Sequence, residues 1–352
     1  MLLNLMKILI PATAAFTFGI LITPLATHYF YKYKMWKKRA RTQTVGSTEF
    51  SKIHKDKEAS EVSTPCVGGI IVWFSVLATS AGFYLLSVLF PNNTFLHGLN
   101  FFSRSQTLLP LGVLFLGAIL GLFDDMLEIT GHSNITRDSF WYTKLKLGII
   151  TVIGAIAGWW FFTKLGMDSV HVPWDGMWYL GIWFIPFVVL IMLATFSGGV
   201  IDGIDGLSGG VLSCIFAAYA VIAYANNQID LAALSLVISG ATLAFLWFNI
   251  PPARFYMGET GMMPLTIVLA TFAFLTDTVL LLPIIAFPLV ATSFSSSAQL
   301  IAKRFGKKVF KVAPLHHHFE ALGWPGYKVT MRYWVLSIIF AILGVILAIM
   351  TK

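Results

Sequence analysis

Charged residues are scarce in this sequence. Asp, Glu, Lys and Arg make up 11% of the 352 residues, whereas a soluble domain contains about 25%, and hydrophobic residues make up 57%. The mean hydropathy is +0.79. No charged run or low-complexity linker is long enough to separate a water-soluble domain. The composition therefore predicts an integral membrane protein with a single polytopic domain over residues 1–352.

Cysteine is also scarce. Cys66 and Cys214 are the two cysteines of the chain, and they form neither a CxxC pair nor a disulfide framework. We interpret both as structural thiols. The net charge of +8 would suit a nucleic-acid-binding protein, but an excess of Lys and Arg is typical of the cytoplasmic loops of a membrane protein. We therefore expect no nucleic-acid partner and a lipid bilayer as the surroundings.

Long apolar runs, in contrast, are abundant. A helix that spans a bilayer needs about 20 mostly apolar residues. A basic segment follows the first apolar run, so we interpret that run as a retained span rather than a cleaved signal. The sequence predicts ten spans, at residues 8–30, 67–90, 106–123, 145–163, 178–196, 207–225, 231–249, 260–276, 279–301 and 333–351.

The basic residues give the expected orientation. If the segment 31–66 lies in the cytoplasm and the spans alternate, four of the 24 Lys and Arg residues fall on the outer side, namely Lys7, Arg104, Lys164 and Lys352. Cytoplasmic loops are enriched in Lys and Arg. We therefore predict an all-α integral membrane protein with both termini on the outer side.

The acidic and histidine residues of interest then share the cytoplasmic face, although they are far apart in the sequence. Acids beside a membrane span are costly and usually functional. We therefore expect these residues to line a cytoplasmic active-site cleft. They stand near the cytoplasmic ends of different spans: Asp124, Asp125, Asp202, Asp205, Glu259, His316, His317 and His318.

The paired carboxylates are compatible with a magnesium site. Adjacent carboxylates repel each other unless a cation lies between them, and Mg²⁺ takes one or two carboxylates plus water and phosphate oxygens. The alternative for Asp124 and Asp125 is an acidic helix end in solvent. Asp202 and Asp205 lie in the glycine-rich run 197–210, which lacks the acid spacing of a calcium-binding EF-hand loop. The alternative for this pair is a polar turn.

Two further segments suggest contacts to a nucleotide or a phosphate. The loop 249–261 combines an amide, a cation, aromatic residues and an acid, which suits stacking on a base or an aromatic belt at the membrane surface. Three consecutive histidines, His316–His318, seldom converge on one metal ion, and no zinc-site spacing accompanies them. We expect them to neutralise phosphate charge instead.

An ordered set of motifs over nearly the whole chain resembles the polyprenyl-phosphate N-acetylhexosamine-1-phosphate transferase superfamily. The run Pro314–Glu320 is typical of its branch of phospho-N-acetylmuramoyl-pentapeptide transferases. The motifs are Thr64-Pro65 with Gly68-Gly69, Gly121-Leu122-Phe123-Asp124-Asp125, Asp202-Gly203-Ile204-Asp205-Gly206, Pro252-Ala253-Arg254 with Met257-Gly258, and Ala313-Pro314-Leu315-His316-His317-His318-Phe319-Glu320 before Gly323-Trp324-Pro325.

The resemblance implies ten membrane helices, a magnesium-dependent cytoplasmic cleft and a homodimer in the bacterial inner membrane. It also implies the reaction. Undecaprenyl phosphate would attack the sugar-bound phosphate of UDP-N-acetylmuramoyl-pentapeptide, UMP would leave, and a lipid diphosphate sugar (lipid I) would form. Phosphoryl transfer depends mainly on positioning and charge neutralisation, and acids, magnesium and basic groups supply these.

The resemblance also assigns roles to individual residues. Asp124 matches the base or the orienter of the lipid phosphate, with Asp125 beside it and Lys146 near the same phosphate. Asp202, Asp205 and Glu259 match the magnesium ligands, and Asp202 is also implied to be catalytic. The remaining expected contacts to the nucleotide, sugar or phosphates are Thr64, Asn249, Tyr256, Asp205, His316, His317 and His318.

The chain departs from the pattern of the superfamily at four positions. Glu259 stands where Asp is usual, Phe196 and Gly199 stand where asparagines are usual, and Glu61 stands where lysine is common. These departures favour an alternative donor, UDP-N-acetylglucosamine or another UDP-sugar, whereas the histidine triplet argues against it. An ion-coupled secondary transporter is an alternative from another class, but its acids would lie at the centres of spans. A catalytically silent scaffold would not need acids in four separate loops.

Overall fold

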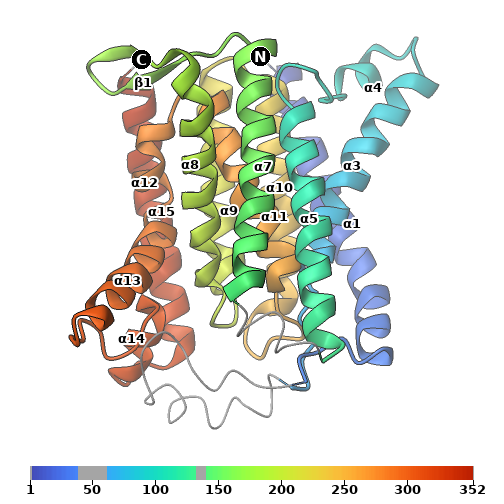
Figure 1. Cartoon of the computed structure of the whole chain (residues 1–352). Coiled ribbons are helices and arrows are strands. Elements are labelled where there is room, and N and C mark those ends of the chain that lie inside the picture. The colour runs from blue at the N-terminus through green and yellow to red at the C-terminus, as the bar shows by residue number, and fades with distance from the viewer. Residues whose placement is uncertain (1, 39–61, 132–139, 352) are drawn as a thin grey trace.

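The computed structural model describes residues 2–38, 62–131 and 140–351. Within these ranges nine helices are long and apolar enough to cross a membrane, and a bent helix pair is a tenth candidate span. Figure 1 shows them side by side in one bundle. The helices are α1 (Leu2–Lys32), α3 (Gly69–Leu89), α5 (Leu108–Ile129), α7 (Phe140–Lys164), α8 (Phe184–Ser197), α9 (Leu207–Ala225), α10 (Ile229–Asn249), α11 (Gly258–Leu275), α15 (Gly326–Met350) and the bent pair α12 (Leu282–Ile285) and α13 (Phe287–Arg304). The span of α8 includes the 3-10 turns at both of its ends and covers Gly181–Ile201.

A β-hairpin is a correction to the expected all-α structure. β1 (Ser169–Val172) pairs antiparallel with β2 (Gly176–Tyr179). Trp174 and Gly176 both have positive φ, which closes the tight turn between the strands. As a result, α8 begins six residues after the predicted start of its span. The other short elements are α4 (Thr94–Gly98), η1 (Gly181–Trp183), η2 (Gly198–Ile201), η3 (Val279–Leu281) and α14 (Leu315–Ala321).

The prediction of a continuous helix over 279–301 is wrong. The segments 279–285 and 287–304 meet at an angle of 88°. Pro288 lies in the first turn of α13 and has no N–H group to continue the α12 hydrogen-bond ladder, and Ala286 between them is not helical. In Figure 1, α13 leans away from the bundle. The last span also starts earlier than predicted, at Gly326.

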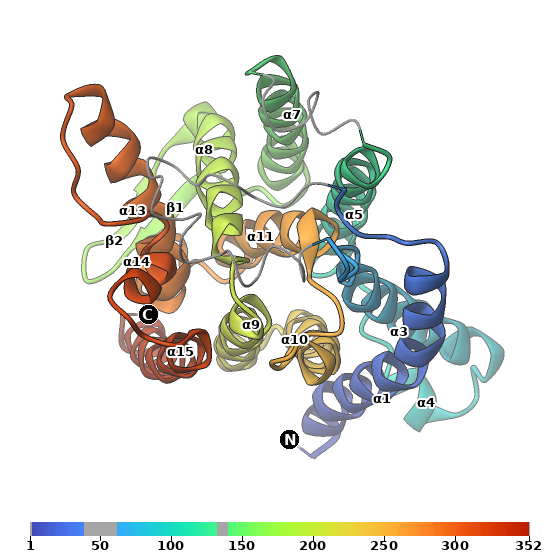
Figure 2. The ribbon, with the colours of Figure 1, turned by 90° about the horizontal axis from the view of Figure 1, so that it is seen from below.

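Helix α11 forms the middle of the bundle. Nearly all of its side chains from Thr260 onward are buried. It packs against α3, α5, α8 and α9, and Figure 2 shows it between α8 and the pair α9 and α10. The first turn of α11 is therefore surrounded by the ends of several other helices, which positions the candidate site.

The two ends of the bundle carry different segments of the chain. Both termini lie at one end, and α14, the α8–α9 connection and the α10–α11 loop lie at the other (Figure 1). The spans thus alternate in direction, as the sequence predicts, while the side of the membrane that each end faces stays a prediction. The end of α5 is a further correction: the helix continues to Ile129, so Asp124 and Asp125 lie inside its last turns rather than at its end.

Glycines allow two helices to approach α11 closely. Gly117 and Gly121 of α5 face Pro264 and the backbone of Glu259, and Gly69 of α3 faces the backbone of Gly261. A Cβ atom at any of these glycines would overlap α11. Small residues spaced by four are typical of close helix contacts in membranes.

We predict that Gly121→Ala lowers the free energy of unfolding by about 1–3 kcal/mol, because the added methyl group overpacks the α5–α11 contact. The measurement is denaturant unfolding of the detergent-solubilised protein, followed by tryptophan fluorescence. Gly112→Ala, on the same helix, is the control, since a Cβ there has no neighbouring atom within 4 Å. Equal stability of the two variants would contradict the packing described for α5.

Candidate active site

Asp125 bonds to the N-terminus of α11 from a neighbouring helix. Its Oδ2 accepts hydrogen bonds from the backbone N of Thr260 at 2.8 Å and from Thr260 Oγ1 at 2.7 Å, and its Oδ1 accepts one from the backbone N of Glu259 at 3.3 Å. The first N–H groups of a helix have no partner within the helix, and they carry partial positive charge. Asp125 is fully buried because these bonds replace its water.

Asp202 binds the same helix end from the other side. Its Oδ2 accepts a hydrogen bond from the backbone N of Gly258 at 3.2 Å, and its Oδ1 accepts one from Ser208 Oγ at 2.7 Å. Gly258 has a φ of +65°, and a Cβ atom there would lie 2.5 Å from Asp125 Oδ2. Glycine therefore lets two carboxylates approach one helix turn.

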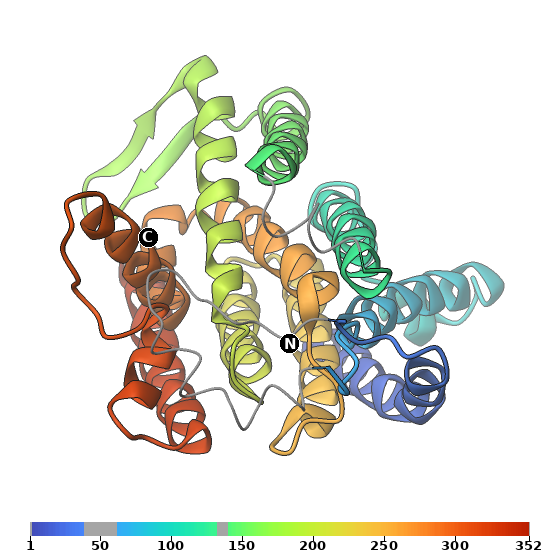
Figure 3. The same cartoon turned by 60° about the horizontal axis from the view of Figure 1, so that its bottom comes forward.

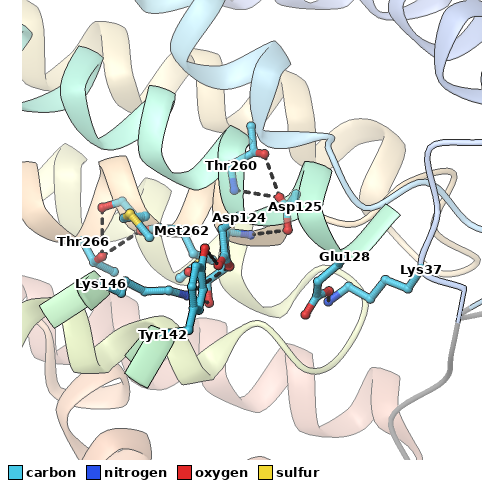
Figure 4. A network of polar contacts seen from close by, with 11 residues as sticks. Lys37, Asp124, Asp125, Glu128, Tyr142, Lys146, Thr260, Met262 and Thr266 are labelled. Atoms are coloured by element: carbon cyan, nitrogen blue, oxygen red, sulfur yellow. Dashed lines mark hydrogen bonds and ion pairs between the residues drawn. The ribbon is translucent and has the colours of Figure 1, made fainter. Parts of the chain in front are cut away.

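Asp124 faces α7 rather than α11. Its Oδ2 accepts a hydrogen bond from Lys146 Nζ at 3.0 Å, and its Oδ1 accepts one from Tyr142 Oη at 2.6 Å (Figure 4). Lys146 Nζ also lies 3.7 Å from Glu259 Oε1. Asp124 is 4% exposed. The structure thus brings three predicted site residues, Asp124, Lys146 and Glu259, into one charged cluster.

Sequence reasoning missed two residues of this network. Tyr142 lies before the predicted start of its span at residue 145, and the structure extends that helix back to residue 140. The spacing of four to Lys146 is the signal that would have indicated it. Lys37 forms a 2.7 Å ion pair with Glu128, and both side chains are largely buried (Figure 4). This pair attaches the segment after α1 to the end of α5.

Asn249 and Asp205 connect two loops of the site. Asn249 is buried, its Oδ1 accepts a hydrogen bond from the backbone N of Gly206 at 2.8 Å, and its Nδ2 donates to the carbonyl of Phe255 at 2.8 Å. Asp205 Oδ2 accepts a hydrogen bond from the backbone N of Ala253 at 3.1 Å. The α10–α11 loop is therefore held against residues 202–206, which we call the acidic loop, and Asn249 bonds to both loops.

The segment that contains Thr64 runs beside the α10–α11 loop (Figure 3). The backbone N of Tyr256 donates to the carbonyl of Pro65, and the carbonyl of Tyr256 accepts from the backbone N of Gly68. Thr64 is buried and Tyr256 is half-buried.

Cys66 follows Pro65 in this segment. Burial raises the pKa of the Cys66 thiol to about 12, so the thiol stays protonated at neutral pH. Both cysteines are free thiols.

The three histidines of the triplet lie in two different environments. His316 and His317 are buried against Gly203, and a Cβ atom at Gly203 would lie 2.8 Å from His317 Nε2. His317 Nδ1 lies 2.7 Å from Glu320 Oε2. Because a carboxylate accepts, Nδ1 carries the proton, and Nε2 faces the acidic loop.

His318 points elsewhere. Its Nδ1 accepts a hydrogen bond from the backbone N of Lys311 at 3.2 Å, and its ring meets Phe310 edge-on. Burial, reinforced by the Lys311 charge, lowers the pKa of the His318 imidazole. The neutral ring thus supports the segment before α14, and His318 lies apart from the pair at Gly203.

The acids at the first turn of α11 fit a magnesium ion that shares its coordination shell with phosphate oxygens. In the part of the chain that the structure describes, no three His, Cys, Asp or Glu side chains are arranged to hold a metal. Mg²⁺ binds through one or two carboxylates, however, and completes its shell with water and phosphate oxygens. Glu259, with a side chain 39% exposed, and Asp202, bonded to the preceding residue, suit this mode of binding. Asp124 and Glu259 both contact Lys146, so this cluster has one more negative charge than positive charge.

The departures from the superfamily pattern have different surroundings. Phe196 packs against the core, so it contributes no polar group. Among the described residues, a Cβ atom at Gly199 would have only Met262 Cβ within 4 Å, at 3.9 Å, so no described neighbour fills the place of a side chain there. Glu61 lies outside the described residues.

Known proteins resemble this chain over almost its full length. The glycosyl transferase family 4 profile matches residues 107–277. A phospho-N-acetylmuramoyl-pentapeptide-transferase of Chloroflexus aggregans is 31% identical over 363 residues, covering 98% of this chain and 90% of the relative. The protein of that name from Anoxybacillus flavithermus is 32% identical over 348 residues, covering 97% and 98%. That from Chloroflexus aurantiacus is 33% identical over 331 residues, covering 89% and 84%.

We predict that Thr260→Val lowers the free energy of unfolding by about 1–3 kcal/mol, because it removes a donor to the buried Asp125 carboxylate. Thr266→Val is the matched control on α11, since Thr266 Oγ1 donates only to carbonyls of its own helix among the described residues (Figure 4). Denaturant unfolding of both variants is the measurement. A Thr260→Val loss no larger than that of Thr266→Val would show that Asp125 does not depend on this hydroxyl.

Proposed function

The chain belongs to the phospho-N-acetylmuramoyl-pentapeptide-transferase family, and from this premise we propose that it transfers phospho-N-acetylmuramoyl-pentapeptide from UDP to undecaprenyl phosphate. An oxygen of the lipid phosphate attacks the sugar-bound phosphorus. The bond from that phosphorus to the UMP oxygen breaks, UMP leaves with the electron pair, and a lipid diphosphate sugar remains. Family membership and the apolar helices together make the chain a membrane transferase of peptidoglycan precursor synthesis.

One observation carries the proposal at the level of residues. Asp124, Lys146 and Glu259, which come from three helices, meet beside the first turn of α11. The cluster lies near the ends of apolar helices, where a substrate with a lipid tail and a polar head would have both parts in suitable surroundings. Lys146 is the cation of this cluster and its side chain is 21% exposed, so we assign it to the lipid phosphate.

The other residues of the site are proposed to bind the donor. The loop held by Asn249 and Asp205 carries Tyr256, whose ring suits stacking on the uracil base. His317 presents Nε2 beside the acidic loop, and with His316 it is assigned to the phosphate or sugar of the donor. Buried donors placed where charge develops are the largest contribution to most phosphoryl and acyl transfers.

Magnesium is the proposed cofactor. Glu259 and Asp202 would hold it together with phosphate oxygens of the donor, and the bound ion would neutralise the charge of the donor diphosphate. Asp124 accepts hydrogen bonds at both oxygens in this structure, which supports a role in holding Lys146. We propose a location in the bacterial inner membrane, with the site facing the cytoplasm, and the surplus of Lys and Arg in the loops of that side supports it.

The proposal is tested by UMP release from the purified protein with undecaprenyl phosphate and magnesium. We expect release with UDP-N-acetylmuramoyl-pentapeptide, none with UDP-N-acetylglucosamine, and loss of release when a chelator removes magnesium. Release with UDP-N-acetylglucosamine but not with UDP-N-acetylmuramoyl-pentapeptide would mean that the protein catalyses the same type of reaction with a different donor. No release with either donor from a folded sample would contradict the proposed reaction.

Lysine variants in the same assay test the site. Lys146→Gln should lower kcat about 100-fold or more, as expected when a charged donor that holds the attacking lipid phosphate is lost. Lys7→Gln is the matched control, because Lys7 pairs with Asp230 at the opposite end of the bundle and is equally exposed, at 21%. Equal activities of the two variants would show that Lys146 has no role in the proposed reaction.

A further inference from the structure

Two side chains of α7 hold the Asp124 carboxylate. Tyr142 donates from Oη to Oδ1 at 2.6 Å, and Lys146 donates from Nζ to Oδ2 at 3.0 Å (Figure 4). The two residues are one helical turn apart, so they project from the same face of α7. The Lys146 ammonium also lies 5.7 Å from the centre of the Tyr142 ring. These three side chains form a closed arrangement, and each contacts the other two.

The carboxylate needs both donors to keep one orientation. Asp124 is 4% exposed, so little water can replace a lost partner, and a buried charge without hydrogen bonds is costly. With the Tyr142 bond removed, the carboxylate can rotate about its Cβ–Cγ bond, and Oδ2 no longer has a fixed place. Lys146 would then be drawn towards Glu259, whose Oε1 lies 3.7 Å away.

We propose that Tyr142 is a positioning residue: its hydroxyl orients Asp124, and Asp124 in turn holds the Lys146 ammonium towards the lipid phosphate. This inference rests on the proposed function, and it names a residue for which neither the motifs nor the family resemblance gives a role. Tyr142 acts through Asp124 and does not touch the donor. Its removal should therefore affect the lipid substrate and the turnover more than the nucleotide substrate.

The kinetic test compares Tyr142→Phe with wild type while each substrate is varied in turn. The variant loses only the hydroxyl, so we expect kcat to fall about 10- to 100-fold, the range for one hydrogen bond to a charged group. The KM for undecaprenyl phosphate should rise, and the KM for the UDP-sugar should stay within twofold. The control is Tyr84→Phe on α3, because Tyr84 is exposed and its hydroxyl has no hydrogen bond to any described residue.

Two kinetic outcomes would overturn the inference. The first is a kcat of Tyr142→Phe within twofold of wild type. The second is an equal rise in both KM values together with a lower thermal unfolding midpoint, because a merely structural role would produce that pattern.

A thermal double-mutant cycle tests the contact without any turnover. It compares the unfolding midpoints of Tyr142→Phe, Asp124→Asn and the double variant. If Tyr142 acts through Asp124, the double variant should resemble Asp124→Asn alone, and strictly additive shifts would overturn the inference. The cycle applies even if the wild-type protein releases no UMP, so failure of the proposed function and failure of this inference are distinguishable.

Discussion

The arrangement of the site depends on the hydrogen bonds between the first turn of α11 and two carboxylates. Asp125 of α5 accepts hydrogen bonds from the backbone N–H groups of Glu259 and Thr260, and Asp202 accepts one from the backbone N–H of Gly258. A helix N-terminus attracts negative charge, and the low dielectric near a membrane strengthens each bond. Because the Asp125 and Asp202 carboxylates both bond to this turn, Glu259 is presented next to Lys146. Asp124 on α5 and Glu259 on α11 then contact the same ammonium.

Much of this arrangement follows from the sequence. The apolar runs predicted nine of the membrane helices to within a few residues at most ends, because about 20 apolar residues have few alternatives to a helix in a bilayer. The alternation of spans also placed Asp124, Asp202, Glu259 and His317 at one end of the bundle. The motifs indicated the correct family. The role of each residue in binding and catalysis stays a prediction.

The remaining features depend on contacts that the sequence pattern does not encode. The hydropathy of 279–301 is continuous and does not indicate the break at Ala286. Pro288 is visible in the sequence, but prolines are tolerated inside membrane helices, so its presence alone does not predict a bend of 88°. Tyr142 has no motif, and its partner Asp124 comes from another helix. The three histidines look equivalent in the sequence, but His318 faces Lys311 while the other two face Gly203. Asn249 matched a nucleotide contact by resemblance, and the structure shows both ends of its amide bonded to backbone groups.

Hydrogen–deuterium exchange of the peptide that contains Gly258, Glu259 and Thr260 tests the central claim most directly. The account predicts slow exchange of these amides in the wild-type protein and faster exchange in Asp125→Ala, with no change in the middle of α11 at residues 266–272. Fast exchange at 258–260 in the wild type, or equal exchange in the wild type and the variant, would contradict the claim that the carboxylates hold this helix end.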